Sequence, residues 1–546
     1  MSEFRKIIKS FPSNISVEPD DEVVLEVILK KPSESFGNIL EPIIPPDVIY
    51  EVNQAFDDEK TTKFYFLKFP EIPATGYEHF GFELARELKK EIGAEEVNFL
   101  GRGHFYGGTA AFDGGTETYD QGALESSLVT CETKRNDQLP KAWAHSFTNV
   151  EAHHNERVGA GVSIAVIDTG ASEHDELADV FNIGAGINLI EKGLPPLDVL
   201  SEEVKRASPG HGSLVASVIA SRGGLTNDQD TSGPGKITGI APSAKIIPIR
   251  AIRSVVDIRL SRIAGAIKHA IKQDADIITM CLGSPFGSRS VKEALQLAVD
   301  AGIIVICAAG NCYGPVVFPA RYASKDLAIA VAAVTHRKYP WRYTSMGRSV
   351  TISSPGEHVW GATYLDGDER RFDLKHLIRP SQGTTLATSV TSGIAALWLS
   401  HHGKETIKNA AAARGQSVLQ LFRDAITSDL TPPSEWNGSD ELGAGIIDAT
   451  KTLAYDIFNT RQQDAILVSR VNESMGDVFL NDADDKLGLT GNEPDFAEFA
   501  NELVWNSFMS QAQERAEPPL ETGLNLDKRT IKKSISLEML LRNKVT

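Results

Sequence analysis

The sequence has few cysteines. Four occur, at Cys131, Cys281, Cys307 and Cys312, and their spacing fits no metal-binding motif. Cys281 and Cys307 sit inside apolar runs that are typical of strands, where a small buried thiol is the expected role. Because disulfide frameworks belong to oxidising compartments, scattered cysteines favour a reducing one. We therefore expect an intracellular, cytoplasmic protein.

The chain also lacks the features that bring proteins to membranes or nucleic acids. Residues 1–8 lead into a mixed sequence without the apolar core of a signal peptide. No apolar run reaches the roughly 18 residues that a membrane-spanning helix needs. Lys and Arg number 55 against 73 Asp and Glu, a net charge of −18. Nucleic acids and anionic membranes bind surfaces on which positive charge is clustered, so we expect neither as a partner.

What is present is typical of a globular protein, with 41% hydrophobic and 23% charged residues. A length of 546 residues exceeds one ordinary domain. The patterning predicts an N-terminal α+β accessory region at 1–141, a main domain at 142–455 and a C-terminal helical extension at 456–546. In the extension, the spacing of Phe496, Phe499 and Leu503 predicts an amphipathic helix that packs back on the main domain.

Short apolar runs alternate with helical patterns throughout the main domain. Such alternation predicts an α/β fold, a doubly wound and mainly parallel sheet with helices on both faces. The predicted strands are Val162–Ile167, Lys245–Arg250, Asp276–Cys281, Ile303–Ala308 and Leu327–Val334, and the predicted helices are Ser213–Ala220, Leu260–Ile271, Val291–Ala301 and a long one from Thr385. In the N-terminal region the pattern predicts strands at Val23–Leu29, Phe64–Phe69 and Val97–Leu100, and a helix through Phe80, Leu84 and Leu88.

Polar residues follow the strands of the main domain, where parallel sheets collect their reacting groups. Asp168 ends the first strand and could orient a histidine, although Asp-Thr-Gly is also an ordinary turn. His211 opens a small-residue helix, and a lone histidine there is as often structural. Asn311 ends another strand and could donate to an oxyanion or simply form a turn. The segment Cys281–Ser284 could pair with an extended peptide backbone.

The long helix beginning near Thr385 carries no charge until His401, so we expect it to be buried. Its first turn offers unpaired backbone N–H groups and a positive dipole end, which suits a hydroxyl that must meet a carbonyl. A core helix whose threonines cap its own start is the simpler interpretation of this stretch alone.

Together these motifs resemble the subtilisin-like peptidases, or subtilases, across roughly residues 142–455. Asp168-Thr169-Gly170 is similar to the family's aspartate motif, and His211-Gly212-Ser213 to its histidine motif. Ala309-Gly310-Asn311 resembles the asparagine motif. The order Asp, His, hydroxyl differs from that of α/β-hydrolases and chymotrypsin-like enzymes, and no Gly-x-Ser-x-Gly elbow occurs. The resemblance implies an endopeptidase in which Asp168 orients His211, His211 transfers the proton, and Asn311 binds the oxyanion.

The nucleophile motif departs from the family pattern, because Gly383-Thr384-Thr385 stands where Gly-Thr-Ser is usual. Threonine keeps a nucleophilic oxygen, but its methyl group restricts χ1 beside the reacting groups. Three alternatives follow: a peptidase that works through Thr385, an inactivated or substituted copy of an active one, and a peptide-binding pseudoprotease.

The resemblance also implies a protein or peptide substrate, pairing along Cys281–Ser284 and Val256–Arg259. It implies no organic cofactor. Many family members bind structural Ca²⁺, but no set of oxygen ligands can be placed here. The N-terminal region is similar to half of a subtilase prodomain, so it is either an intramolecular inhibitor cut near Gly101–Lys141 or a permanent accessory domain.

Overall fold

The fold is described from a computed structural model of the chain. The described residues are 2–11, 17, 21–33, 35–56, 62–74, 76–100, 139–154, 158–199, 210–223, 237–253, 260–284, 287–311, 316–364, 376–459, 499, 501–503, 505–506, 533–534 and 536–539. Among them, no helix is both long and apolar enough to cross a membrane.

The N-terminal region forms an antiparallel sheet with strand order β2-β3-β1-β4. Its strands are β1 (Glu22–Ser33), β2 (Glu51–Gln54), β3 (Thr62–Pro73) and β4 (Glu96–Leu100), and its helices are α1 (Glu3–Ile8), α2 (Phe36–Leu40) and α3 (Glu78–Ile92). The helix α3 ends at Gly93, whose φ of 63° gives the left-handed cap that glycine favours. The three predicted strands and the predicted helix are present, whereas α1, α2 and β2 were not predicted.

The main domain is built on a seven-stranded parallel sheet with the order β11-β10-β9-β8-β5-β7-β6. Its strands are β5 (Ser163–Asp168), β6 (Ile187–Asn188), β7 (Lys245–Arg250), β8 (Ile277–Met280), β9 (Ile304–Ala308), β10 (Ile329–Val334) and β11 (Ile352–Pro355). These strands are buried almost throughout, which explains their unbroken apolar runs. The predicted α/β class with a mainly parallel sheet is confirmed.

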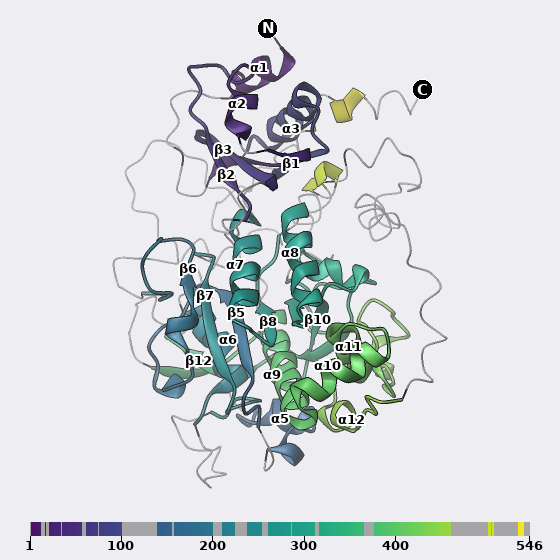
Figure 1. The fold of residues 1–546 in the computed structure, drawn as a ribbon. Coiled ribbons are helices and arrows are strands. Elements are labelled where there is room, and N and C mark those ends of the chain that lie inside the picture. The colour runs from purple at the N-terminus through teal and green to yellow at the C-terminus, as the bar shows by residue number, and fades with distance from the viewer. Residues whose placement is uncertain are drawn as a thin grey trace, which may run out of the picture.

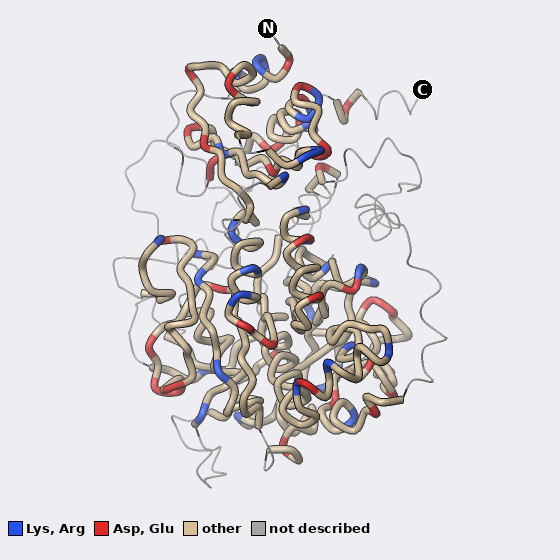
Figure 2. Tube along the Cα trace, viewed as in Figure 1, with Lys and Arg blue, Asp and Glu red and all other residues tan. Residues whose placement is uncertain are grey.

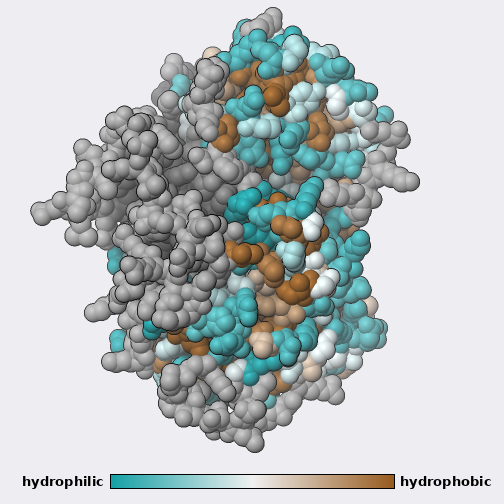
Figure 3. Space-filling view, turned by 90° about the vertical axis from the view of Figure 1, so that its left-hand side faces the viewer, coloured by the Kyte–Doolittle hydropathy of each residue, from teal (hydrophilic) through white to brown (hydrophobic). Residues whose placement is uncertain are grey.

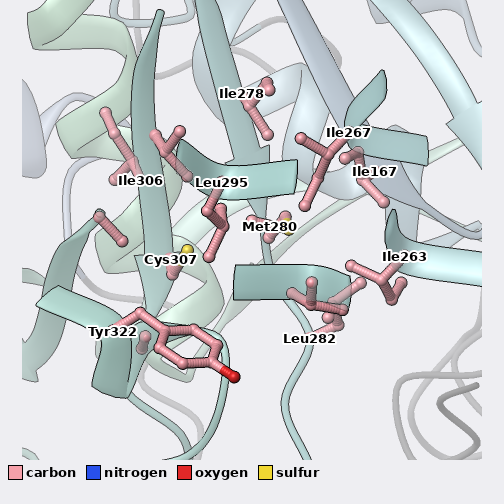
Figure 4. Packing of buried hydrophobic residues seen from close by; sticks show 14 of the residues in the cluster. Ile167, Ile263, Ile267, Ile278, Met280, Leu282, Leu295, Ile306, Cys307 and Tyr322 are labelled. Carbon is pink, nitrogen blue, oxygen red and sulfur yellow. The ribbon is translucent and has the colours of Figure 1, made fainter. Parts of the chain in front are cut away.

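Helix pairs flank this sheet (Figure 1). The first pair is α7 (Leu260–Lys272) and α8 (Arg289–Asp300), and the second is α6 (His211–Ala220) and α9 (Thr384–His402). In Figure 4, Ile167, Met280 and Cys307 of the strands meet Ile263, Ile267 and Leu295 of α7 and α8. Every residue of α9 from Thr384 to Ser400 is buried, as its lack of charge predicts. The remaining elements are α5 (Trp143–Phe147), the hairpin β12 (Val359–Thr363) and β13 (Leu377–Ser381), and the helices α10 (Lys404–Ala413), α11 (Val418–Thr427) and α12 (Ala449–Ala454).

The N-terminal sheet lies over the ends of α7 and α8 (Figure 1). Glu26 of β1 is fully buried there and caps the start of α8. Its carboxylate accepts hydrogen bonds from Ser288 Oγ at 2.7 Å and from the backbone N–H groups of Arg289 at 2.9 Å and Ser290 at 2.8 Å. A carboxylate at this position satisfies unpaired helix donors and complements the helix dipole. The hydrogen bonds from the start of α8 to Glu26 thus join the main domain to the N-terminal region.

The C-terminal extension does not follow its predicted packing. Glu502 and Phe499 contact Arg86 of α3, in the N-terminal region, and Glu502 also contacts Ser534 of the C-terminal extension. Figure 1 shows the two short C-terminal pieces beside that region. The expectation that this helix packs on the main domain is wrong for these residues, because amphipathic spacing shows that a face is buried but not against what.

The described surface carries charges of both signs, interspersed along the trace (Figure 2). On the face seen in Figure 3, hydrophilic residues predominate and hydrophobic ones form small separate groups among them. Isolated apolar side chains such as Leu194 and Val199 are ordinary on a protein surface.

Candidate active site

Asp168 and His211 meet at the carboxyl end of strand β5, which lies between β8 and β7. Asp168 is the last residue of that strand and is 0% exposed. His211 is the first residue of α6, and its Nδ1 lies 2.8 Å from Asp168 Oδ1 and 3.0 Å from Oδ2. Thr169 N–H also donates to Asp168 Oδ1, at 2.7 Å. This geometry makes the carboxylate the acceptor of an Nδ1–H proton, so the lone pair of the neutral ring is on Nε2.

Glycines on both sides of His211 allow the helix to begin there. Gly210 has a φ of 68°, in the left-handed region. A Cβ on Gly212 would lie 2.3 Å from the carbonyl oxygen of Gly170, so only glycine fits at that position. Gly212 N–H donates instead to Thr169 Oγ1, at 3.1 Å. The segment after Asp168 is therefore in direct contact with the start of α6.

A buried ion pair, Asp198 with Arg250, holds the backbone at Gly210 before α6 and at Thr169 after β5. Asp198 Oδ2 accepts the backbone N–H of Gly210 at 3.0 Å, and its Oδ1 lies 3.2 Å from Arg250 Nη1. Arg250 ends β7 directly beside Asp168 in the sheet register and also donates to the carbonyl of Thr169. The side chains of Asp198 and Arg250 are each 1% exposed. The sequence patterns did not predict this pair, although a charged residue at the end of the apolar strand Lys245–Arg250 was a usable signal.

Arg250 also binds Glu191 at the edge of the site. Its Nε donates to Glu191 Oε2 at 3.0 Å, and Arg253 Nη1 donates to Oε1 at 3.0 Å. Burial alone would raise the pKa of Glu191, but the hydrogen bond and charge of Arg250 outweigh it and lower that pKa. The arginine is thus held by two carboxylates.

Thr385 is the second residue of α9 and is 7% exposed. Its carbonyl oxygen accepts a hydrogen bond from Ser389 Oγ at 2.9 Å and a weaker one from Cys281 Sγ at 3.6 Å. Burial, and then the negative charge of Asp168, raise the pKa of the Cys281 thiol well above its usual range. Asp168 and Cys281 are at the same carboxyl edge of the sheet, because β5 and β8 pair Ile167 with Met280 and these two residues come next. The Cys281–Thr385 contact brings the start of α9 to that edge.

Asn311 lies against the start of the same helix. Its Oδ1 accepts hydrogen bonds from Thr384 N–H at 2.9 Å and from Thr384 Oγ1 at 2.8 Å. A Cβ on Gly383 would lie 3.2 Å from Asn311 Nδ2, so the amide nitrogen faces the residue that precedes the helix. Because the amide oxygen is already used twice, its nitrogen is the group that can donate to a ligand next to Thr385.

The predicted peptide-pairing segment Cys281–Ser284 follows β8 and is buried. Ser284 N–H donates to the carbonyl of Phe318 at 2.8 Å, and Phe318 N–H donates back at 2.9 Å. Both backbone groups of Ser284 therefore face Phe318, which corrects the expectation that they pair with a peptide. Leu282 and Gly283 remain as candidates. The other predicted segment, Val256–Arg259, lies outside the described residues.

Within the described ranges, no group of three or more His, Cys, Asp or Glu side chains could hold a metal ion. The candidate site consists of the Asp168 carboxylate and the His211 imidazole at the start of α6, and of the Thr385 hydroxyl and the Asn311 amide at the start of α9. Such a set can generate a nucleophile and stabilise an oxyanion.

The chain is similar to known proteins of one family. Residues 159–430 match the Subtilase family, peptidase family S8. The thermostable alkaline protease of Halalkalibacterium halodurans is 32% identical over 281 residues, 51% of this chain and 68% of that protein. Subtilisin Savinase of Lederbergia lenta is 28% identical over 290 residues, 51% of this chain and 93% of that protein. A solved structure of proteases from Pseudoalteromonas arctica covers 59% of this chain and 99% of its own, at 23% identity and a TM-score of 0.46.

Proposed function

Because the chain belongs to the subtilase family and is a subtilisin-like endopeptidase, we propose that Thr385 is its nucleophile. Asp168, His211 and Asn311 complete the proposed set. The observation that carries this proposal is the Asp168–His211 hydrogen bond of 2.8 Å. Asn311, which binds the first residue of α9 next to Thr385, supports it. The proposed reaction needs no organic cofactor.

In the proposed reaction, His211 Nε2 takes the proton from Thr385 Oγ1 as the hydroxyl attacks the scissile carbonyl. Asp168 keeps the second proton of the ring on Nδ1 and stabilises the imidazolium that forms. Asn311 Nδ2 and the backbone N–H of Thr385 donate to the oxyanion. His211 then gives its proton to the leaving amine, and water releases the acyl group by the same steps.

The Thr385 methyl group sets the expected rate. It fixes χ1 and must fit into a nearly closed position, because the residue is 7% exposed. A displacement of the oxygen by about 1 Å can lower the rate roughly 100-fold. We therefore propose slow turnover by the natural chain and faster turnover by Thr385→Ser.

A fluorophosphonate probe and a peptide substrate test this proposal on the full chain. We expect slow labelling of the unaltered protein, labelling of Thr385→Ser roughly 100-fold faster, and none of Thr385→Ala. Silence of both the unaltered protein and Thr385→Ser, with the fold intact, would contradict the proposal. Peptide binding without labelling would then support a pseudoprotease.

We further propose that the substrate is an extended peptide that pairs at Leu282 and Gly283. The N-terminal region is proposed to be an intramolecular inhibitor. Its support is the cap that Glu26 places on α8 and the position of Lys268 of α7, whose Nζ lies 4.6 Å from the ring centroid of Phe56. Active preparations should then show a cut between residues 101 and 141, a tract of which 101–138 lies outside the described residues. Full activity with an intact N-terminus would contradict this role.

A cytoplasmic location is proposed as well. Its support is the presence of free, buried thiols at Cys281 and Cys307. Fractionation of the cells that make the protein tests it.

A further inference from the structure

Arg86 of α3 is the centre of a buried polar cluster that joins the two ends of the chain. Its Nη1 donates to Glu502 Oε2 at 3.1 Å, across 416 positions of the sequence. Its Nη2 donates to Glu83 Oε2 at 2.9 Å and also to Ser534 Oγ. Glu502 is 1% exposed. In this buried site a guanidinium contacts two carboxylates and a hydroxyl. Such a contact is specific, because removing one partner would leave an uncompensated charge away from water.

The C-terminal segments also bind each other through this cluster. Glu502 accepts hydrogen bonds from Ser534 N–H at 2.6 Å and from Ser534 Oγ at 2.8 Å. Ser536 N–H donates to Glu83 Oε2 at 3.2 Å, and its hydroxyl donates to the other oxygen of Glu83. Burial would raise the pKa of Glu83, but the contacts with Ser536 and Arg86 outweigh it and lower that pKa. Glu83 is therefore ionised opposite Arg86.

An aromatic ring packs against the cluster, and other apolar side chains of the C-terminal segments are buried. The ring of Phe499 lies over the Arg86 guanidinium, with its centroid 4.6 Å from Cζ. Phe499, Trp505 and Leu537 are all buried. Burial raises the pKa of Glu502, and the charge of Arg86 and the hydrogen bonds from Ser534 oppose that rise. We call the described residues Phe499, Glu502, Ser534 and Ser536, which hold Arg86 and Glu83, the clasp.

A second contact connects the clasp to the docking site of the N-terminal sheet. Asn501 Nδ2 donates to Asn98 Oδ1 of β4 at 3.3 Å. Asn98 Nδ2 in turn donates to Glu26 Oε2 at 3.1 Å, and Glu26 caps α8. The C-terminal segment therefore helps to fix the amide that orients the capping carboxylate.

We propose that the clasp retains the N-terminal region on the main domain after the chain between them has been cut. The region is held on two faces: its sheet by α7 and α8, and its helix α3 by the C-terminal segments. The segments that carry the clasp follow the main domain in sequence, so a cut before the main domain leaves them attached to it. Retention is a binding property and needs no activity. Its consequence, that a cut alone does not relieve inhibition, rests on the proposed inhibitor role.

The test uses the full chain with a site for an added protease inserted after Gly115. After cleavage, size-exclusion chromatography measures how much of the N-terminal fragment stays with the main domain, and fragment binding gives its dissociation constant. We expect retention by the otherwise unaltered chain. Glu502→Ala should weaken retention roughly 100-fold or more, because it leaves a buried cation with one of its two carboxylates. A chain ending at Asn459 should lose the fragment to a similar extent.

Lys90→Ala is the matched control, since Lys90 lies one turn further along α3 in an exposed pair with Glu87. It should change retention less than threefold. Equal retention by the unaltered, Glu502→Ala and shortened chains would overturn the proposal, and so would complete loss from the unaltered chain. A Thr385→Ala background should give the same retention. Failure of the clasp is therefore distinguishable from failure of the proposed chemistry.

Discussion

Two buried charge networks in this molecule are built in different ways. The network of the active site consists of the pairs Asp168–His211 and Asp198–Arg250. Asp168 and Arg250 end neighbouring parallel strands inside the continuous core. The clasp joins Arg86 to Glu502 and Ser534 from the far end of the chain, beside an aromatic ring. The difference indicates that removing a charge from the first network affects catalysis or the whole fold. Removing one from the second affects a local docking contact.

The largest effect is expected from Asp168→Asn in the Thr385→Ser background. The side chain keeps its shape but no longer holds His211 in the required tautomer, so kcat should fall about 10⁴-fold. Peptide hydrolysis under saturating substrate measures it. Retention of the N-terminal fragment should not change. A coupled loss of both would show that the two networks are not independent.

Arg250→Met and Arg86→Met compare the networks directly. Arg250→Met leaves Asp198 buried without its cation, and the free energy of unfolding of the main domain should fall by about 3–5 kcal/mol. Arg86→Met should instead increase hydrogen exchange only in α3 and the C-terminal segments. Denaturant unfolding and exchange mass spectrometry separate these outcomes. Global destabilisation by both variants would break the comparison.

His145 of α5 gives a third effect, which depends on pH. Burial, and then the charge of His154, lower its pKa to about 4 from 6.5. Above pH 6.5 neither the folded nor the unfolded state binds the proton, so the stabilisation is complete. As the pH falls from 6.5 towards 4, the unfolded chain binds the proton first. The main domain should thereby lose about 3 kcal/mol. His145→Gln should remove this slope, whereas the exposed His401→Gln should leave it.

The smallest effect is expected outside both networks. Ser417 caps α11 through a reciprocal capping box with Gln420. Ser417→Ala should lower the free energy of unfolding by about 1 kcal/mol, without any change in hydrolysis or fragment retention. Thermal unfolding measures it. A change in hydrolysis or in fragment retention would mean that a small loss of stability elsewhere also affects the two networks.

The sequence predicted two kinds of feature well: strands that are buried along their whole length, and residues that belong to short motifs. The strand Lys245–Arg250 has the predicted bounds, because strands buried on both faces leave uninterrupted apolar runs. Asp168 and His211 were predicted as partners from the resemblance of their motifs, and they are in hydrogen-bond contact. Asn311 was predicted as a donor and lies at the start of α9.

The remaining contacts depend on which distant segments meet. The pairing of Asp198 with Arg250 follows from strand order, and periodicity carries no information on that order. The glycine-containing segment of Ser284 suggested that its backbone could pair with a peptide. Its backbone groups instead pair with Phe318, which comes from a later segment. The contact of Glu502 with Arg86 has no local signal at all, because a glutamate in an amphipathic helix is usually solvated.

The position of Cys281 has a practical consequence. Its sulfur touches the backbone of the proposed nucleophile, yet burial and the nearby carboxylate keep the proton on the thiol. Alkylating agents and mild oxidants attack thiolates, so this sulfur should stay unmodified although it adjoins the reacting centre. Iodoacetamide should therefore leave Cys281 unmodified in the folded protein, and peptide mass spectrometry of the treated chain measures it.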